Sequence, residues 1–320
     1  MIPDDIFFKI VRSAVRAPSG HNTQPWLFAK EDDGICMMPD FSRALPVADP
    51  EHRELFISLG CAAETALIAA RFYGYSPALQ NHVSNTDCSI KILLQKDDTI
   101  EQPSLFSYVT ARQTTRNLYA ARSVLAEDIA TLKNMDGGNS IRFFMGQKEI
   151  RQFSPFIAEA NTIQMSNPRF KSELIQWMRF SEKEAMQKGD GLYSACSGVP
   201  SMGRVFGSFV LKNFVTAKSE NKRLLKQLGT TAAVALFTSQ KDSIEDWIKT
   251  GMTFQRFALT VAKLGLNHSY INLPCQINQV RDKMMKDLGL AGFPQLIIRL
   301  GYSQKMHFSF RRRIDEVILR

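Results

Sequence analysis

Cysteine is scarce and irregularly spaced in this chain, which argues against several kinds of protein. The 320 residues contain five cysteines, an odd number, at Cys36, Cys61, Cys88, Cys196 and Cys275. No two of them form a C-x-x-C pair, and no histidine lies at metal-ligand spacing from them. We therefore expect reduced thiols, as in a cytoplasmic protein, and no structural metal site.

Long apolar runs are also missing. The stretch 55–75 is interrupted by Glu64 and Arg71, and the stretch 229–238 is shorter than the roughly 20 residues that span a bilayer. The opening residues, MIPDDIFFKIV, carry acid where a secretory signal needs base, and their apolar run stops at Lys9. We expect a cytoplasmic protein with no membrane partner.

The positive charge lacks the pattern of a nucleic-acid module. The formal net charge is +9, but basic residues are mostly interleaved with acidic ones; the exception is the run Arg311, Arg312 and Arg313. No aromatic interleaving accompanies that run. No strand is followed by G-x-G-x-x-G, so we expect no separate dinucleotide-binding domain. A phosphate-bearing small molecule fits this charge better than a nucleic acid does.

The residues that are present describe a globular protein with a sizeable core. Hydrophobic residues make up 44% of the chain and charged residues 22%, and this length allows one large domain or two. Apolar spacing predicts a helix over 4–16 that ends at Pro18-Ser19-Gly20. The pattern then predicts, in order, strands at 26–29 and 35–38, a deeply buried helix at 51–73 rich in small residues, and a strand at 89–95.

The second half repeats this plan. A shift of 191 residues places Gly60 on Gly251, so that two helices ending in glycine have like periodicity. A helix at 126–135, a turn at 137–139 and a strand at 141–145 follow the order of the chain's opening, and further strands are expected at 232–238 and 295–301. The sequence thus predicts an α+β fold, an α/β sandwich with halves at 1–105 and 106–320 that form an intramolecular pseudo-dimer.

One stretch has no counterpart in the first half. Residues 184–216 are rich in Gly and Ser with scattered large apolar groups, which indicates either a lid over a site or a surface insertion. We favour a lid because Leu192, Val199, Phe206 and Phe209 would need cover.

Several motifs together resemble the nitroreductase superfamily of flavin enzymes. Residues 17–28, APSGHNTQPWLF, resemble the loop that follows an early helix in that family, and ARQTTRNLY at 111–119 resembles its Arg-x-Ser-x-Lys/Arg motif. The segments 271–290 and 301–318 are similar to family segments as well. The resemblance implies a nitroreductase-like fold.

The order of these motifs differs from that in ordinary members, which are homodimers. The first half has the Pro-Ser loop without the arginine motif, and the second half has RQTTR with only MDGGNSIRF where the loop should recur. This resembles fused single-chain members, including a mycobacterial group whose flavin is covered by a lid. The resemblance implies one FMN per chain, and it favours a monomeric pseudo-dimer over a further homodimer.

The resemblance also implies roles for particular residues. Arg112 and Thr114 would hold the FMN phosphate with Gln113 bonded nearby, and Arg116 would reach the N1 to C2-carbonyl edge of the flavin. Arginine suits phosphate because its planar fork binds bidentately. The remaining cofactor-binding residues that we expect are Ser19, Gly20, Asn22, Gln24, Leu273, Pro274, Cys275, Arg311 and Arg312.

Each assignment has a plainer alternative. Arg112 and Arg116, four residues apart, could decorate a helix face. The arginine run could be a solvated tail, and Cys275 a buried small residue. We expect His21 to be a surface group with a binding role at most, and we assign no catalytic residue.

Three functions are compatible with these patterns. The first is an FMN-dependent oxidoreductase that uses NAD(P)H to reduce a small-molecule electron acceptor such as a nitroaromatic or a quinone. The second is an FMN-sequestering protein without turnover, because a lid covers the flavin. The third is a flavin-free interaction protein.

Overall fold

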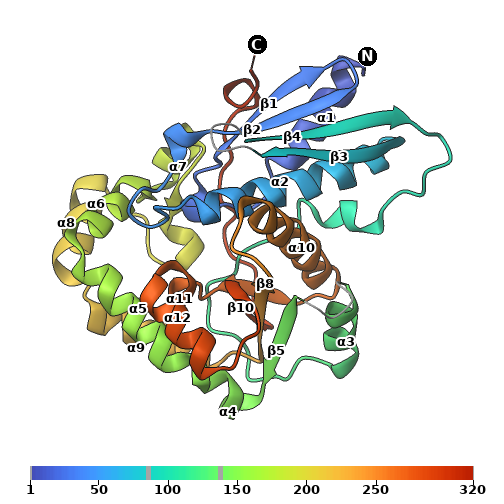
Figure 1. Cartoon of the computed structure of the whole chain (residues 1–320). Helices are drawn as coiled ribbons and strands as arrows, with labels where there is room; N and C mark the ends of the chain where they lie inside the picture. Colours follow the sequence, from blue (N-terminus) through green and yellow to red (C-terminus); the bar gives the residue numbers. More distant parts are fainter. Residues whose placement is uncertain (1, 84–87, 136–139, 320) are drawn as a thin grey trace.

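The computed structural model describes residues 2–83, 88–135 and 140–319. The turn expected at 137–139 lies outside these residues. The described chain is built of helices and two larger antiparallel sheets, which confirms the α+β class (Figure 1).

The first sheet and its helices come from the first hundred residues. Its order is β1-β2-β4-β3, and every neighbouring pair is antiparallel. In chain order the elements are α1 (Asp4–Ala14), β1 (Trp26–Glu31), β2 (Gly34–Pro39), α2 (Arg53–Phe72), β3 (Tyr75–Val83) and β4 (Cys88–Lys96).

The second sheet repeats the arrangement of the first. Its order is β5-β8-β10-β9, again antiparallel throughout. Numbered within each half, both sheets therefore run 1-2-4-3, and both halves follow the chain order α-β-β-α-β-β. The elements are α3 (Ala126–Asn134), β5 (Ile141–Met145), β8 (Ala233–Ser239), α10 (Ile244–Lys263), β9 (Asn267–Tyr270) and β10 (Phe293–Gly301).

The sequence patterns did not predict β3. This strand contains Pro77 and a polar stretch, both of which weaken a strand signal. The strand lies at the edge of its sheet, where proline is tolerated because one side of the strand needs no partner.

The two long helices α2 and α10 cross in the middle of the molecule. A Cβ on Gly60 would lie 2.0 Å from the Ile248 carbonyl oxygen, and a Cβ on Gly251 would lie 2.0 Å from the Ile57 carbonyl oxygen. The two helix backbones therefore touch at the pair of glycines that the 191-residue shift aligns. The main hydrophobic core continues through this crossing and includes buried residues of both halves.

One helix of the described residues, α2, is long and apolar enough to cross a membrane. Its apolar window is 83% buried inside the molecule, as expected of a core helix.

The segment of the second half that has no counterpart in the first half is longer than expected. Residues 146–229, here called the middle segment, stand between β5 and β8 where the first half has only the tight turn between β1 and β2. The prediction of 184–216 covered only part of it. Its elements are α4 (Gly146–Ile150), α5 (Ser154–Ser166), α6 (Pro168–Trp177), β6 (Met178–Arg179), α7 (Glu182–Lys188), β7 (Leu192–Tyr193), α8 (Arg204–Phe214) and α9 (Ala217–Gly229).

The apolar side chains of the middle segment are not all covered, contrary to our expectation. Val199, Phe206 and Phe209 are 43%, 61% and 55% exposed. Phe206 and Phe209 lie in α8, whose Gly207 faces Phe180, so the helix turns these two phenylalanines away from its covered side.

Two backbone pairings attach distant segments to the sheets, and the first of them joins the two halves. The backbone of Phe28 in β1 bonds to Val317 and Leu319 at 2.8 Å each, so the C-terminal segment joins the first sheet. The amide of Thr115 donates to the His268 carbonyl at 2.8 Å, which attaches the RQTTR segment to the edge of β9. Figure 1 shows the C-terminal segment running back up the molecule to end near the N-terminus.

Candidate functional site

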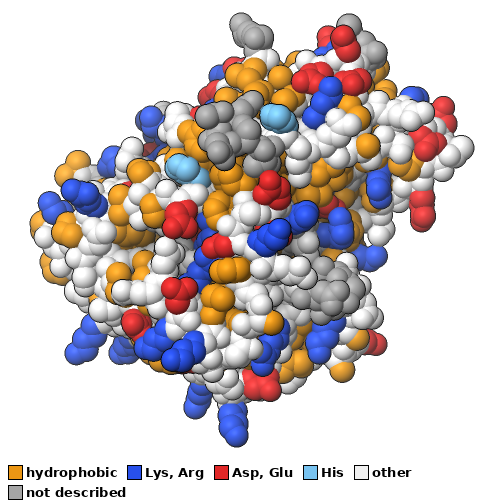
Figure 2. All heavy atoms as spheres, in the orientation of Figure 1, with side chains coloured by type: hydrophobic (Ala, Val, Ile, Leu, Met, Phe, Trp, Pro, Cys, Tyr) orange, Lys and Arg blue, Asp and Glu red, His pale blue; other side chains and the backbone are white. Residues whose placement is uncertain are grey.

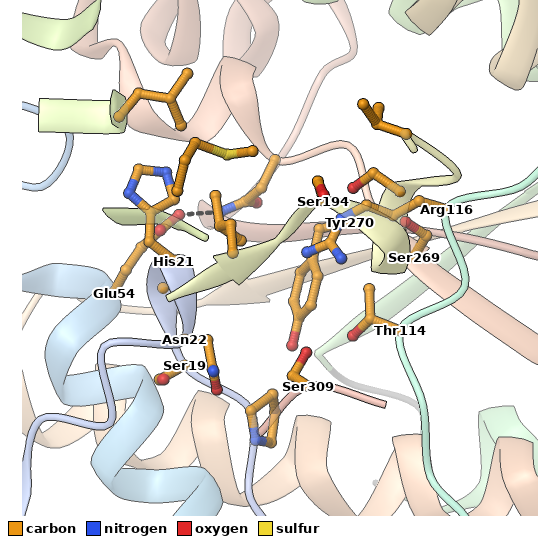
Figure 3. Close-up of a pocket in the computed structure, with 18 of the residues that line it drawn as sticks. Ser19, His21, Asn22, Glu54, Thr114, Arg116, Ser194, Ser269, Tyr270 and Ser309 are labelled. Carbon is orange, nitrogen blue, oxygen red and sulfur yellow. Dashed lines mark hydrogen bonds between the residues drawn. The ribbon is translucent and has the colours of Figure 1, made fainter. Parts of the chain in front are cut away.

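A cavity of about 530 Å³ brings together segments that are far apart in the sequence. This volume lies in the usual range for a small-molecule or cofactor site, roughly 300 to 1,000 Å³. The wall is formed by the early loop 16–22, α2, residues 109–116, the middle segment, the chain from β9 into α11 (Leu273–Gln276), and the C-terminal residues 307–311. Figure 3 shows side chains from these segments pointing into one space.

The early loop is held in an unusual backbone conformation. His21, Asn22 and Gln24 have φ values of 45°, 55° and 54°, in the left-handed region that residues other than glycine rarely adopt. The Ser19 hydroxyl accepts from the Gln24 amide at 2.9 Å. The Asn22 side chain donates to the carbonyls of Gly191 and Phe310 at 3.1 Å each, so the middle segment and the C-terminal segment hold the loop in place.

Three of the four loop residues expected at the site, Ser19, Gly20 and Asn22, line the cavity, and Gln24 does not. Gln24 is fully buried away from the cavity, where it donates to the Gly189 carbonyl at 2.8 Å. Gly20 lines the cavity, but a Cβ there would meet only Leu45 and Glu54 at 3.4 and 3.5 Å. No close approach within the chain therefore requires glycine at this position.

Arg112 is a buried cation whose charge no carboxylate of the described residues neutralises. It lines the cavity and is only 6% exposed, and its Nη2 donates to the Arg16 carbonyl at 3.2 Å. Its Nε and Nη1 have no hydrogen-bond partner, and among the described residues no carboxylate forms an ion pair with it. An unpaired charged donor in a buried site costs more than the roughly 1 to 3 kcal/mol of a neutral one. The site is therefore suited to a bound anion.

The RQTTR segment is not helical, so the alternative of arginines on a helix face does not apply to it. Arg112, Gln113, Thr114 and Arg116 all line the cavity. Gln113 is bonded at both ends of its amide to the C-terminal segment, since its Oε1 accepts from the Met306 amide at 2.8 Å and its Nε2 donates to the Met306 carbonyl at 2.5 Å.

Arg116 lies across the cavity from His21 and near Tyr270 in Figure 3. Burial, followed by the charge of Arg116, lowers the pKa of His21 to about 4. His21 is thus a neutral imidazole in the cavity wall, not the surface group that we expected. The pKa of His268 in β9 falls to about 3, because burial and then the charges of Arg112 and Arg116 disfavour its protonation.

The C-terminal arginines separate into two environments. Arg311 lines the cavity, and its guanidinium donates to the Val15 carbonyl at 2.9 Å and to the Asn22 Oδ1 at 3.1 Å. Burial, followed by the charge of Arg112, lowers its pKa to about 9.

Arg312 does not line this cavity but lies, with Arg311, in the wall of a neighbouring one. Its side chain is 8% exposed and pairs with Asp40 at 3.3 Å, and its Nη2 donates to the Glu316 carbonyl at 2.7 Å. Because Asp40 already neutralises it, Arg312 fastens the C-terminal segment to β2 instead. Neither arginine belongs to a solvated tail.

Of the three residues expected near the flavin ring, only Leu273 lines the cavity. Pro274 and Cys275 are buried behind it in α11. Burial raises the pKa of Cys275 to about 12, so its thiol is an unreactive core group, as the alternative reading held.

The sequence analysis missed several lining residues, among them Arg16, Glu54, Asn272 and Tyr270. Arg16 directly precedes the Ala-Pro-Ser motif, so its place in the sequence could have indicated that it lines the site. Glu54 and Tyr270 lie in a core helix and a short strand, where no local pattern distinguishes a cavity residue from a core residue.

No family model matches the chain. A Mycobacterium tuberculosis protein named "Putative NAD(P)H nitroreductase Rv3131" is 24% identical over 312 residues, an alignment that covers 92% of this chain and 84% of that protein. Another protein of that organism, "Putative NAD(P)H nitroreductase acg", is 21% identical over 335 residues, with 99% and 96% covered.

Solved structures also resemble parts of the chain. An FMN-dependent nitroreductase of Mycobacterium smegmatis in complex with NADPH has a TM-score of 0.40 and 13% identity, and covers 65% of this chain and 94% of its own. An iodotyrosine deiodinase bound to FMN has a TM-score of 0.42 and 16% identity, with 68% and 97% covered. We draw no conclusion from likenesses this weak. The chain is thus similar in sequence, over nearly its whole length, to two mycobacterial proteins that are named putative NAD(P)H nitroreductases.

Proposed function

We propose that the protein is an FMN-dependent NAD(P)H oxidoreductase that reduces flat acceptors such as nitroaromatics or quinones. The observation that carries this proposal is the buried Arg112 guanidinium, which lines a cofactor-sized cavity and has two nitrogens without a partner. The printed names of the mycobacterial relatives point to the same activity.

The residues of the cavity fit FMN. A phosphate dianion would provide the counter-ion that Arg112 lacks. The guanidinium groups of Arg16 and Arg311 lie close enough to add to the positive charge at this place. Figure 3 shows small polar side chains, including Ser19, Thr114 and Ser309, around the same space, which suit the hydroxyls of a ribityl chain. We leave Gln24, Arg312, Pro274 and Cys275 out of the proposed binding set, because they do not line the cavity.

The early loop and the RQTTR segment would hold FMN between them. Arg112 would bind the phosphate, and Arg116 would provide positive charge beside the ring. When bound, FMN accepts hydride from NAD(P)H and passes electrons to a flat acceptor. The chain's own part is to bind and orient both reactants and to exclude water through the middle segment.

We also propose that the halves 1–105 and 106–320 take the places of two subunits in a single compact unit. The shared sheet order and the glycine crossing of α2 and α10 support this arrangement. The early loop of one half and the RQTTR segment of the other line one cavity, which supports one FMN per chain. The cysteines of the described residues form no disulfide, which suits a cytoplasmic location.

Replacing Arg112 tests the binding assignment. Arg112→Gln should raise the Kd for FMN about 10- to 100-fold, because a charge-assisted hydrogen bond contributes roughly 1.5 to 3 kcal/mol. Flavin fluorescence quenching on titration with the purified protein measures this Kd. Arg313→Gln is the matched control, since Arg313 is exposed and pairs with Asp315 at 3.0 Å. Equal FMN affinities for the two variants would show that Arg112 does not bind FMN.

A second candidate, an FMN-sequestering protein, is favoured by the extent of the middle segment. That segment contributes Met178, Phe180, Leu192 and Leu211, among others, to the cavity wall. Anaerobic mixing with NADPH and with NADH separates the two functions: the oxidoreductase bleaches the flavin absorbance, and a sequestering protein does not.

Deleting residues 184–216 would be a poor test of the lid. Gly189 and Gly191 in that stretch hold Gln24 and Asn22 of the early loop, so the deletion would disturb the site itself.

A further inference from the structure

Glu54 places a carboxyl group in the wall of the cavity. It stands in the first turn of α2, and its side chain is 13% exposed. Its Oε1 accepts from the side-chain amides of Asn272 and of Gln276, the second at 2.9 Å. Figure 3 shows this carboxyl on the side of the cavity opposite Arg116 and Thr114.

The two amides that hold Glu54 are themselves fixed. The Asn272 Oδ1 accepts from the Ile297 amide at 3.1 Å, and the Gln276 Oε1 accepts from the Gln164 side chain at 2.7 Å. Each amide can therefore present only its N–H groups to Glu54. Since Oε1 already accepts two bonds, the free oxygen Oε2 is the atom that can carry a proton.

The surroundings of Glu54 favour its protonated form. Burial raises its pKa, and the charge of Asp49 acts in the same direction, while Arg53 and the two amides act against them. Arg53 is a weak counter-ion, because its Nη2 is 3.5 Å from Glu54 and its Nη1 donates to the Gln295 carbonyl at 2.6 Å.

Three further titratable groups near Glu54 are neutral. Tyr270 and Cys275 interact with its charge, and burial raises the pKa of both groups above their ordinary values. His21, in the early loop, is neutral because burial lowers its pKa to about 4.

A carboxylate repels phosphate and a protonated carboxyl group carries no positive charge, so Glu54 does not share the anchoring role of the arginines. We propose that Glu54 is the acid that protonates an oxygen atom of the acceptor bound in this cavity. This inference rests on the proposed oxidoreductase function.

The step balances for a quinone acceptor. Conversion to the hydroquinone takes two electrons and two protons, and the hydride that originates in NAD(P)H supplies both electrons and one proton. The second proton comes from Glu54: the O–H bond at Oε2 breaks as an O–H bond forms on the acceptor. The carboxylate that remains is held by Asn272 and Gln276, and water returns its proton.

Two acceptors with different proton requirements test the proposal. Benzoquinone needs protons to be reduced, whereas ferricyanide takes up electrons alone. In Glu54→Gln, kcat with benzoquinone should fall about 10²-fold, the lower end of the usual contribution of a general acid. The ferricyanide rate and the bleaching of FMN by NADPH should stay at their wild-type values.

The control is Glu51→Gln, because Glu51 is exposed and bonds to Asn278 outside the cavity. It should leave both acceptor rates unchanged. An equal loss with both acceptors in Glu54→Gln would show a merely structural role, and an unchanged benzoquinone rate would also overturn the inference. A wild-type protein whose flavin NADPH fails to bleach would instead refute the proposed oxidoreductase function.

Two further measurements do not depend on turnover of that variant. In the FMN-free protein near neutral pH, the infrared spectrum of wild type minus that of Glu54→Gln should contain a protonated carboxyl band. Glu51→Gln should keep this band, and its absence from wild type overturns the inference.

Gln276→Met removes a hydrogen bond that lowers the pKa of Glu54. The pH at which the benzoquinone rate declines on the alkaline side should therefore be higher in this variant. An unchanged pH profile counts against Glu54.

Discussion

At the scale of single residues, the surroundings decide what an arginine does. Arg112 and Arg312 are both buried, but Arg312 pairs with Asp40 while Arg112 has no carboxylate partner among the described residues. The motif resemblance assigned phosphate binding to both. Only the unpaired one is suited to bind an external anion, since a charge already neutralised within the chain gains little from a second partner.

The buried His268 gives a pH prediction at this scale. Its pKa in the folded chain is about 3, below the ordinary value near 6.5. Between these values the unfolded chain binds a proton that the folded chain does not, so His268 makes the folded state less stable as pH falls from about 6.5 toward 3.

His268→Phe should remove this contribution. In the FMN-free protein, the free energy of unfolding from urea titrations should fall less steeply with decreasing pH in the variant, by up to about 1.4 kcal/mol per pH unit. His82→Phe is the control, because His82 is exposed in β3. Parallel pH profiles for wild type and His268→Phe would contradict a neutral buried imidazole.

At the scale of elements, the crossing of α2 and α10 fixes how the halves meet. Glycine is required at the crossing because each helix backbone occupies the space of the other's Cβ. The alignment of Gly60 with Gly251 was visible in the sequence. Their direct contact was not, because a helix pattern reports which face is buried and not which helix covers it.

Gly60→Ala should therefore destabilise the fold. Its Cβ would lie 2.0 Å from the Ile248 carbonyl, so the helices must separate, at a cost of about 1 to 3 kcal/mol or more. Guanidinium denaturation followed by circular dichroism measures the loss.

Gly229→Ala, within α9, is the matched control, since a Cβ there meets nothing within 4 Å. That change should be neutral or stabilising. If Gly60→Ala unfolds at the same guanidinium concentration as Gly229→Ala, the close crossing is wrong.

At the scale of the whole molecule, the binding site belongs to neither half alone. The C-terminal segment joins the first sheet, and the RQTTR segment joins the second. On the face in Figure 2, acidic and basic side chains are interspersed, so the net charge of +9 does not gather there into one basic patch. The unpaired positive charge of Arg112 lies inside the cavity instead.

This organisation predicts one FMN per chain and a monomer. Flavin released by heating should be equimolar with the 36.2 kDa chain, and light scattering should give the mass of one chain. An ordinary two-subunit arrangement would need a second chain to complete the site, whereas here both contributing segments are in one chain. Two flavins per chain, or a dimer that loses FMN when it dissociates, would contradict the prediction.

The sequence by itself determined the α+β class, the main helices and six strands of the two larger sheets, and the two segments that meet at the site. Each of these leaves a local trace, in apolar periodicity, in turn residues or in a motif such as APSGHNTQPWLF. Only the tertiary structure decided which arginine remains unpaired, that Glu54 faces the cavity, and how far the middle segment extends. Burial and charge pairing depend on neighbours that are distant in the chain, and a local pattern carries no record of them.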